Sequence, residues 1–124
     1  MLHQIKNLTP IGQVAVFYLP VVKLDEVSYG RGGKTPRDMI HEFLIEHYDA
    51  YTLEISNTQG FWRQHKQSKL FVDENARYEV SFAGKDRIPS FVAFLSRMCV
   101  LMDEEAIYLT MGRHSYLVEP EGAE

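Results

Sequence analysis

An α+β fold is predicted by two features of this 124-residue sequence. Short runs alternate apolar and polar residues, as strands do, while two longer runs repeat their apolar residues every three to four positions, as helices do. In chain order the runs read β-α-β-β-α-β, with room for an extra C-terminal strand. The common arrangement for this order is the ferredoxin-like sandwich, one antiparallel sheet with two helices on one face.

The first strand is expected within residues 13–23, QVAVFYLPVVK. It is apolar on both sides, which is typical of a central strand that is covered on both faces. The two sides are Val14, Val16 and Tyr18, and Ala15, Phe17, Leu19 and Val21. Because both helices would cover one face of the sheet, the other face would be exposed unless a second copy covers it. We therefore expect a homodimer.

The first helix is expected to begin at Pro36, with Thr35 as N-cap and Asp38 completing a capping box. Its apolar face consists of Ile40, Phe43, Leu44 and either His47 or Tyr48. The alternating run at 51–56 predicts a strand, and the sequence NTQG at 57–60 predicts a turn after it.

The second half of the chain begins with a predicted loop or hairpin tip at 64–69 and a strand at 77–82. A helix is expected over 87–105, with Pro89 near its start and the acids at 103–105 as its solvated end. Strands at 106–111 and 115–119 would follow, joined by a turn. We expect a single domain over 1–124, with a loose lead-in at 1–12 and a frayed tail at 120–124.

The composition favours a cytoplasmic protein that binds neither membranes nor nucleic acids. A net charge of −4 opposes a general nucleic-acid-coating role. No run approaches the ~18 apolar residues of a membrane span, and no secretory signal follows Met1. The single cysteine, Cys99, lies in an apolar run, so we expect a buried thiol that forms no internal disulfide.

Residues 41–63 combine a helix, an aromatic–Thr pair and a Gly-x-Trp-Arg motif. The motif residues are Tyr51, Thr52, Gly60, Trp62 and Arg63. The pattern resembles a loose family of small uncharacterised bacterial and phage ferredoxin-like domains over about residues 29–82. Some members of that group are lipoproteins, whereas this chain shows no signal peptide. The resemblance supports the fold and implies no catalytic residues, because the group has no assigned activity.

A glycine-rich segment, YGRGGKT at 29–35, precedes the first helix. Its last residues match the end of the phosphate-binding pattern G-x-x-x-x-G-K-[ST], but Ser28 stands where the first glycine belongs. We therefore expect no NTPase. Backbone N–H groups at the helix start, with Arg31 and Lys34 nearby, would still attract an anion. The alternative is a loop that only caps the helix.

A second candidate region is the segment that begins with Phe61 and Trp62. Basic residues follow without an acid: Arg63, His65, Lys66 and Lys69. Aromatic rings beside positive charge can stack on bases and pair with phosphates. The alternative is a Trp62 that packs in the core, followed by a solvated hairpin.

Metal binding and catalysis have weaker signals. His41 and His47 lie six positions apart, and not the four of the zinc motif H-E-x-x-H, so no metal is expected. The turn residues Arg113 and His114 could face a ligand, but a tight turn selects such residues for geometric reasons. No spacing predicts a catalytic triad. We expect no catalytic residue and no cofactor.

The sequence therefore favours a small non-catalytic protein that holds an anionic, nucleotide-like ligand. The expected ligand-binding residues are Tyr29, Arg31, Lys34, Trp62 and Arg63. The alternative is a protein-interaction or inhibitor module that docks its open sheet face or acidic helix on a host protein. A third hypothesis is a small dimeric ferredoxin-like enzyme with a pocket around His47 or His114; the sequence favours the absence of catalysis.

Overall fold

A computed structural model of the chain describes residues 5–64 and 69–122. The elements in chain order are β1 (Gln13–Pro20), α1 (Val21–Leu24), α2 (Pro36–Tyr48), β2 (Thr52–Gln64), β3 (Lys69–Phe82), α3 (Ile88–Leu101), β4 (Ile107–Met111) and β5 (His114–Val118). Short 3-10 helices occupy Val27–Tyr29 and Lys85–Arg87. In the described residues, no helix has the length and apolar character needed to cross a membrane.

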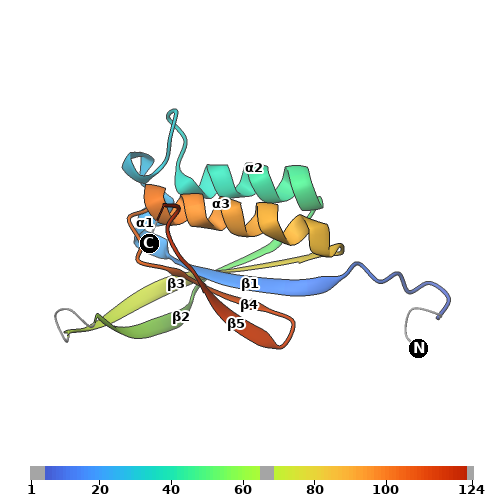
Figure 1. Ribbon diagram of the computed structural model, residues 1–124. Coiled ribbons are helices and arrows are strands. Elements are labelled where there is room, and N and C mark those ends of the chain that lie inside the picture. The colour runs from blue at the N-terminus through green and yellow to red at the C-terminus, as the bar shows by residue number, and fades with distance from the viewer. Residues whose placement is uncertain (1–4, 65–68, 123–124) are drawn as a thin grey trace.

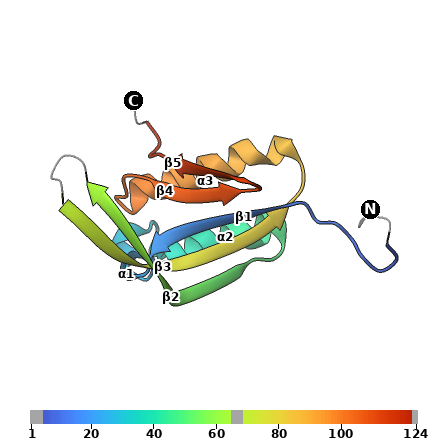
Figure 2. The same ribbon diagram turned by 90° about the horizontal axis from the view of Figure 1, so that it is seen from below.

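The five strands form one sheet in the order β2-β3-β1-β4-β5, and every neighbouring pair is antiparallel. Helices α2 and α3 lie along one face of the sheet (Figure 1). Figure 2 shows the molecule from the other face, with the sheet in front of the helices. The outer parts of β2 and β3 extend past the helices as a two-stranded arm (Figure 1). The prediction of an α+β domain with an antiparallel sheet is confirmed, as is the extra C-terminal strand.

The core lies between the sheet and the helices. Alternate residues of β1, namely Ala15, Phe17 and Leu19, are fully buried on the helix side. Phe17 stands opposite Tyr78 of β3 in register, and their rings stack with centroids 4.9 Å apart. On the other face Val14 is 45% exposed, whereas Val16 is buried. The expected homodimer that would cover this face remains a prediction.

Helix α2 begins as the sequence predicts. The Thr35 hydroxyl accepts a hydrogen bond from the Asp38 backbone N–H, and the Asp38 carboxylate accepts one from the Thr35 backbone N–H. Such a capping box satisfies two N–H groups that the first turn leaves free. Of the two alternatives for the end of the apolar face, Tyr48 packs against the core and His47 is exposed.

The first strand is shorter than predicted. It ends at Pro20, and residues expected to continue it form α1. Proline has no N–H for the sheet ladder and holds φ near −65°, so a strand tends to stop there. This change moves Lys23 from a predicted strand to a short helix.

The predicted turn at 57–60 is wrong. Strand β2 passes through this segment, with a register shift against β3 between Ile55 and Thr58. A bulge of this kind bends a strand without ending it. A Cβ at position 60 would lie 2.7 Å from Nδ2 of Asn75, so a larger residue here would require the Asn75 side chain to shift. Most of the predicted loop at 64–69 lies outside the described residues.

Candidate functional site

A half-open cavity of about 660 Å³ lies where the β2–β3 arm meets the open sheet face and the α3–β4 connection. Its size suits a small molecule. The described residues that line it come from all five strands and from that connection: Tyr18, Pro20, Gln59, Gly60, Phe61, Trp62, Arg63, Asp73, Asn75, Glu104, Glu105, Ala106, Tyr108 and Leu117. We refer to it as the arm pocket.

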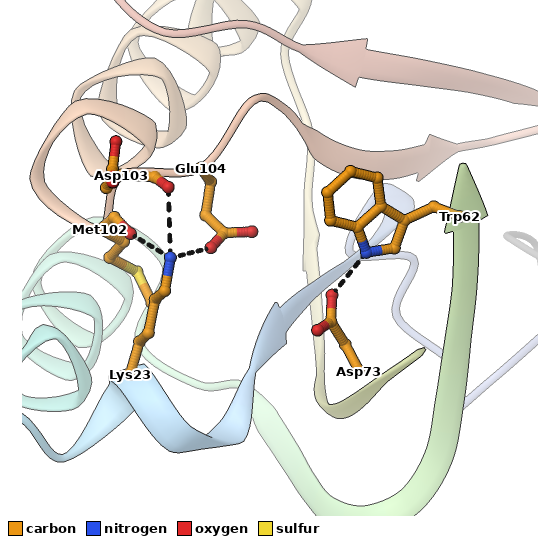
Figure 3. A network of polar contacts seen from close by, with 6 residues as sticks. All are labelled: Lys23, Trp62, Asp73, Met102, Asp103 and Glu104. Atoms are coloured by element: carbon orange, nitrogen blue, oxygen red, sulfur yellow. Dashed lines mark hydrogen bonds and ion pairs between the residues drawn. The ribbon is translucent and has the colours of Figure 1, made fainter. Parts of the chain in front are cut away.

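The arm pocket carries more negative than positive charge. Among its described lining residues are three carboxyl groups, those of Asp73, Glu104 and Glu105, and one guanidinium group, that of Arg63. Asp73 accepts a hydrogen bond at Oδ2 from the indole Nε1 of Trp62 over 2.8 Å (Figure 3). An excess of carboxylates in a concave site raises the local concentration of cations.

Aromatic side chains form much of the remaining wall. The Trp62 ring stacks on Phe71, its direct cross-strand partner, with centroids 4.6 Å apart. Tyr18 of β1 and Tyr108 of β4 also line the pocket, and their ring centroids are 6.0 Å apart. Proteins hold organic cations with carboxylates and with the faces of aromatic rings, and the arm pocket has both.

Glu104 is a largely enclosed acid of the arm pocket. Its side chain is only 17% exposed, and its Oε2 lies 2.6 Å from Nζ of Lys23. Burial is the largest cause and raises the pKa of the Glu104 carboxyl, whereas the hydrogen bond and the charge of Lys23 lower it. The carboxylates of Asp73 and Asp103 add to the upward shift. Enclosed acids with a raised pKa are common at functional sites.

The five residues predicted to bind a ligand fall in different places. Trp62 and Arg63, which are adjacent in the sequence, both line the arm pocket. Tyr29 is not among the described lining residues, but its ring lies 5.1 Å from Nζ of Lys23, the partner of Glu104. Arg31 and Lys34 lie on the glycine-rich segment before α2, and neither is among the described lining residues.

The glycine-rich segment forms a tight turn. Arg31 and Lys34 pair across it in an antiparallel bridge, closed by a hydrogen bond from the Lys34 N–H to the Arg31 carbonyl. Gly32 and Gly33 between them have φ of 65° and 79°, so both central positions need a left-handed backbone. Glycine pairs are favoured at such turns. The Lys34 ammonium lies 2.7 Å from the Glu42 carboxylate.

Most of the charged and aromatic groups of the arm pocket are not predicted by the sequence patterns. Glu104 was expected at the solvated end of a helix, and its enclosure corrects that expectation. Asp73, Tyr18 and Tyr108 gave no signal because they become neighbours only through the strand order. The histidines proposed for an enzyme pocket lie elsewhere: His47 and His114 are both exposed, and neither is among the described residues of this cavity.

Other chemistry has little support in the described part of the chain. It contains no cluster of three or more His, Cys, Asp or Glu side chains that could hold a metal ion. The thiol of Cys99 is buried, as predicted, and donates a hydrogen bond to the Val118 carbonyl. Burial raises the pKa of this thiol to about 12, so it is not a ready nucleophile.

No protein-family model matches the sequence, and a comparison with curated proteins finds no relative. Two solved structures share the fold. Both are of a phage S-adenosylmethionine (SAM) lyase, one in complex with S-methyl-5'-thioadenosine and one in the apo state. Their sequences are 11% and 12% identical to this one, with a TM-score of 0.59 for each. The likeness covers 97% of this chain and 98% of each neighbour.

These comparisons contradict the function predicted from the sequence. A non-catalytic holder of an anionic ligand was expected, but the structural neighbours are an enzyme that binds a small molecule. The charge of the arm pocket gives a physical reason for the error. In the sequence, Trp62 and Arg63 are next to other basic residues. The fold instead brings them beside acids from distant segments of the chain.

Proposed function

We propose that this protein is an enzyme that binds SAM and cleaves it to S-methyl-5'-thioadenosine, with the arm pocket as its active site. The fold likeness to the phage SAM lyase over nearly the whole chain supports the reaction class. We also propose that the fold is ferredoxin-like with β5 added at one edge. The order β2-β3-β1-β4 and the placement of α2 and α3 on one face support this assignment (Figure 1).

The observation that carries the proposal is the combination of acids and aromatic rings in one cavity. SAM has two positive groups, the sulfonium and the α-ammonium. A sulfonium cannot accept or donate an ordinary hydrogen bond, so proteins stabilise it with aromatic faces and with negative charge. In the arm pocket, the aromatic faces are those of Trp62, Tyr18 and Tyr108, and the three carboxyl groups supply the negative charge.

The change of charge during the reaction matches this pocket. An oxygen of the substrate's own carboxylate attacks the carbon bonded to sulfur and closes a lactone ring as the carbon–sulfur bond of the aminocarboxypropyl group breaks. The electron pair goes to sulfur, and the sulfonium becomes a neutral thioether. The acids of the pocket attract the charged substrate more strongly than the neutral thioether product, which eases the release of that product. Asp73 and Glu104 therefore have the role of binding and orienting the substrate in this proposal.

Liquid chromatography with mass detection tests the proposal. Purified protein is incubated with SAM, and S-methyl-5'-thioadenosine is measured over time above the rate without protein. We expect enzyme-dependent product that falls at least about tenfold in Glu104→Gln, because one charge-assisted contact is worth roughly 1.5–3 kcal/mol. The matched control is Glu46→Gln, an exposed acid on α2 that is not among the described pocket residues. Product formation at the uncatalysed rate would reject the proposal.

A further inference from the structure

Lys23 uses all three of its ammonium protons on one short segment of the chain. Its Nζ donates to the Met102 carbonyl over 2.8 Å, to the Asp103 carbonyl over 3.2 Å and to Oε2 of Glu104 over 2.6 Å (Figure 3). Lys23 belongs to α1, and about 80 positions separate it from these partners in the sequence. The contact thus ties α1 to the connection between α3 and β4.

That connection begins with a strained helix end. The N–H of Glu104 bonds to the Cys99 carbonyl and the N–H of Asp103 to the Val100 carbonyl, which is the pattern of a Schellman motif. Asp103 occupies the left-handed position with φ of 53°, where glycine is usual. The ammonium of Lys23 lies at the C-terminal end of α3, where the helix dipole is negative, and donates to the carbonyls of Met102 and Asp103 in this motif. The residue directly after the strained position is Glu104.

We propose that Lys23 is a positioning residue, which holds the Glu104 carboxylate at the wall of the arm pocket by fixing the α3–β4 connection to α1. The inference rests on the proposed function for its catalytic consequence, but the positioning itself is a property of the fold. The two hydrogen bonds from Lys23 to backbone carbonyls fix the position of the α3–β4 connection, and its ion pair with Glu104 fixes the direction of the Glu104 side chain. The Tyr29 ring also lies near the Lys23 ammonium, with 5.1 Å between the ring centroid and Nζ.

The electrostatic surroundings of Glu104 are consistent with this role. The groups that act on its carboxyl come from three elements: Lys23 from α1, Asp73 from β3 and Asp103 from the connection itself. Only Lys23 favours the ionised form, and it counteracts the upward shift of the pKa that burial causes. Without the Lys23 ammonium, burial and the carboxylates of Asp73 and Asp103 would still raise the pKa of Glu104 and nothing would oppose them, so this pKa would rise further.

The first test follows the titration of Glu104 by NMR, in protein labelled with ¹³C at glutamate carboxyl groups. The Glu104 signal is identified by its loss in Glu104→Gln. We expect Lys23→Met to move the titration midpoint of this signal upward and Lys23→Arg to return it toward the native value, because arginine restores the charge. The matched control is Lys34→Met, which removes a lysine from another ion pair of nearly equal length, 2.7 Å to Glu42. An unchanged midpoint in Lys23→Met would overturn the proposal.

The second test measures SAM cleavage at a temperature where each variant is folded by circular dichroism. A displaced carboxylate at a reacting site costs up to roughly a hundredfold. We expect kcat/KM of Lys23→Met to fall by about tenfold or more, with its pH profile shifted in the same direction as the NMR midpoint. Lys34→Met should retain the native kcat/KM and profile. A Lys23→Met variant with lower thermal stability but native kcat/KM and pH profile would mean that Lys23 is only structural.

The two tests fail separately. If the protein does not cleave SAM, the proposed function is wrong, and the NMR titration still decides whether the Lys23 ammonium is in contact with the Glu104 carboxylate in solution. If SAM is cleaved and neither the titration nor kcat/KM responds to Lys23→Met, the function stands and the positioning role is rejected. Should Lys23→Met not fold, Lys23→Gln serves instead, because it also removes the ammonium group and keeps a polar side chain. A native kcat/KM in that variant would contradict the proposal.

Discussion

The indole Nε1 of Trp62 donates a hydrogen bond to Asp73, although the two residues are diagonal neighbours in the β2–β3 arm and not direct partners. In register Trp62 faces Phe71, and Asp73 faces Gly60, which has no side chain. The bond therefore holds an aromatic ring and a carboxylate together on the arm, both at the wall of the same pocket.

This pair gives a direct optical readout. Trp62 is the only tryptophan, so its fluorescence reports on the arm pocket alone. We expect saturable addition of SAM to change the fluorescence. In Asp73→Asn the affinity should fall by about tenfold or more, since a hydrogen bond or ion pair to a charged group is worth roughly 1.5–3 kcal/mol. Asp86→Asn, an exposed acid outside the described pocket residues, is the control. Equal affinity in Asp73→Asn and the control would place the ligand elsewhere.

The strained end of α3 predicts a stabilising substitution. Asp103 has φ of 53°, and glycine adopts this conformation without a steric penalty. We expect Asp103→Gly to raise the free energy of unfolding by about 0.5–1 kcal/mol, after the larger entropy loss of glycine is subtracted. Chemical denaturation measures the change. Asp49→Gly at the end of α2, with φ of 70°, should show a similar gain. A loss of stability in both variants would show that the aspartates contribute more than the strain costs.

The buried hydroxyl of Tyr78 predicts a second stabilising substitution. Its oxygen has no hydrogen-bond partner in the described part of the protein, and its side chain is fully buried. Burial also raises the pKa of this phenol well above its usual value. We expect Tyr78→Phe to raise the free energy of unfolding by about 1 kcal/mol, because an unsatisfied buried polar group costs roughly 1–3 kcal/mol.

Tyr51 offers the comparison for this prediction. Its hydroxyl is paired with Nδ1 of His41 at 2.7 Å, so Tyr51→Phe removes a hydrogen bond and should leave stability unchanged or slightly lower. A Tyr78→Phe variant that is less stable than Tyr51→Phe would mean that the Tyr78 hydroxyl has a partner in solution.

The raised pKa of Glu104 predicts how stability depends on pH. Its pKa in the folded state lies above the unfolded value because burial penalises the charge. The folded state therefore binds this proton more tightly, and the contribution of Glu104 is lost as the pH rises through the folded pKa. Relative to Glu104→Gln, the native protein should gain stability as the pH falls through that range. A difference that is independent of pH, or that grows as the pH rises, would contradict the buried position of this carboxyl.

Much of the fold was accessible from local sequence signals. The two apolar sides of residues 14–19 predicted a central strand, and Thr35 with Asp38 predicted the start of α2. Errors arose at two residues: Pro20 ended a strand that the apolar run continued, and Gly60 lies within β2 beside the Asn75 side chain and not in a turn. The predicted homodimer, the single-domain organisation and the family resemblance remain predictions.

The site was less accessible for a physical reason. Its groups are Tyr18, Trp62, Asp73 and Glu104, which lie on separate segments and meet only because β1 is placed between β3 and β4. Sequence patterns identify neighbours along the chain, so they grouped Trp62 with the basic residues after it. Trp62 was also predicted to share a ligand site with Arg31 and Lys34, which the structure places on a separate turn before α2.

Isothermal titration calorimetry tests whether the arm pocket recognises the sulfonium cation of SAM. SAM, its neutral thioether analogue S-adenosylhomocysteine and ATP are titrated under identical conditions. We expect SAM to bind at least about tenfold more tightly than the thioether, because it places one additional cation beside aromatic rings and carboxylates. We also expect that ATP does not compete with SAM. Equal affinities for SAM and the thioether, or binding of ATP in preference to both, would contradict sulfonium recognition in the arm pocket.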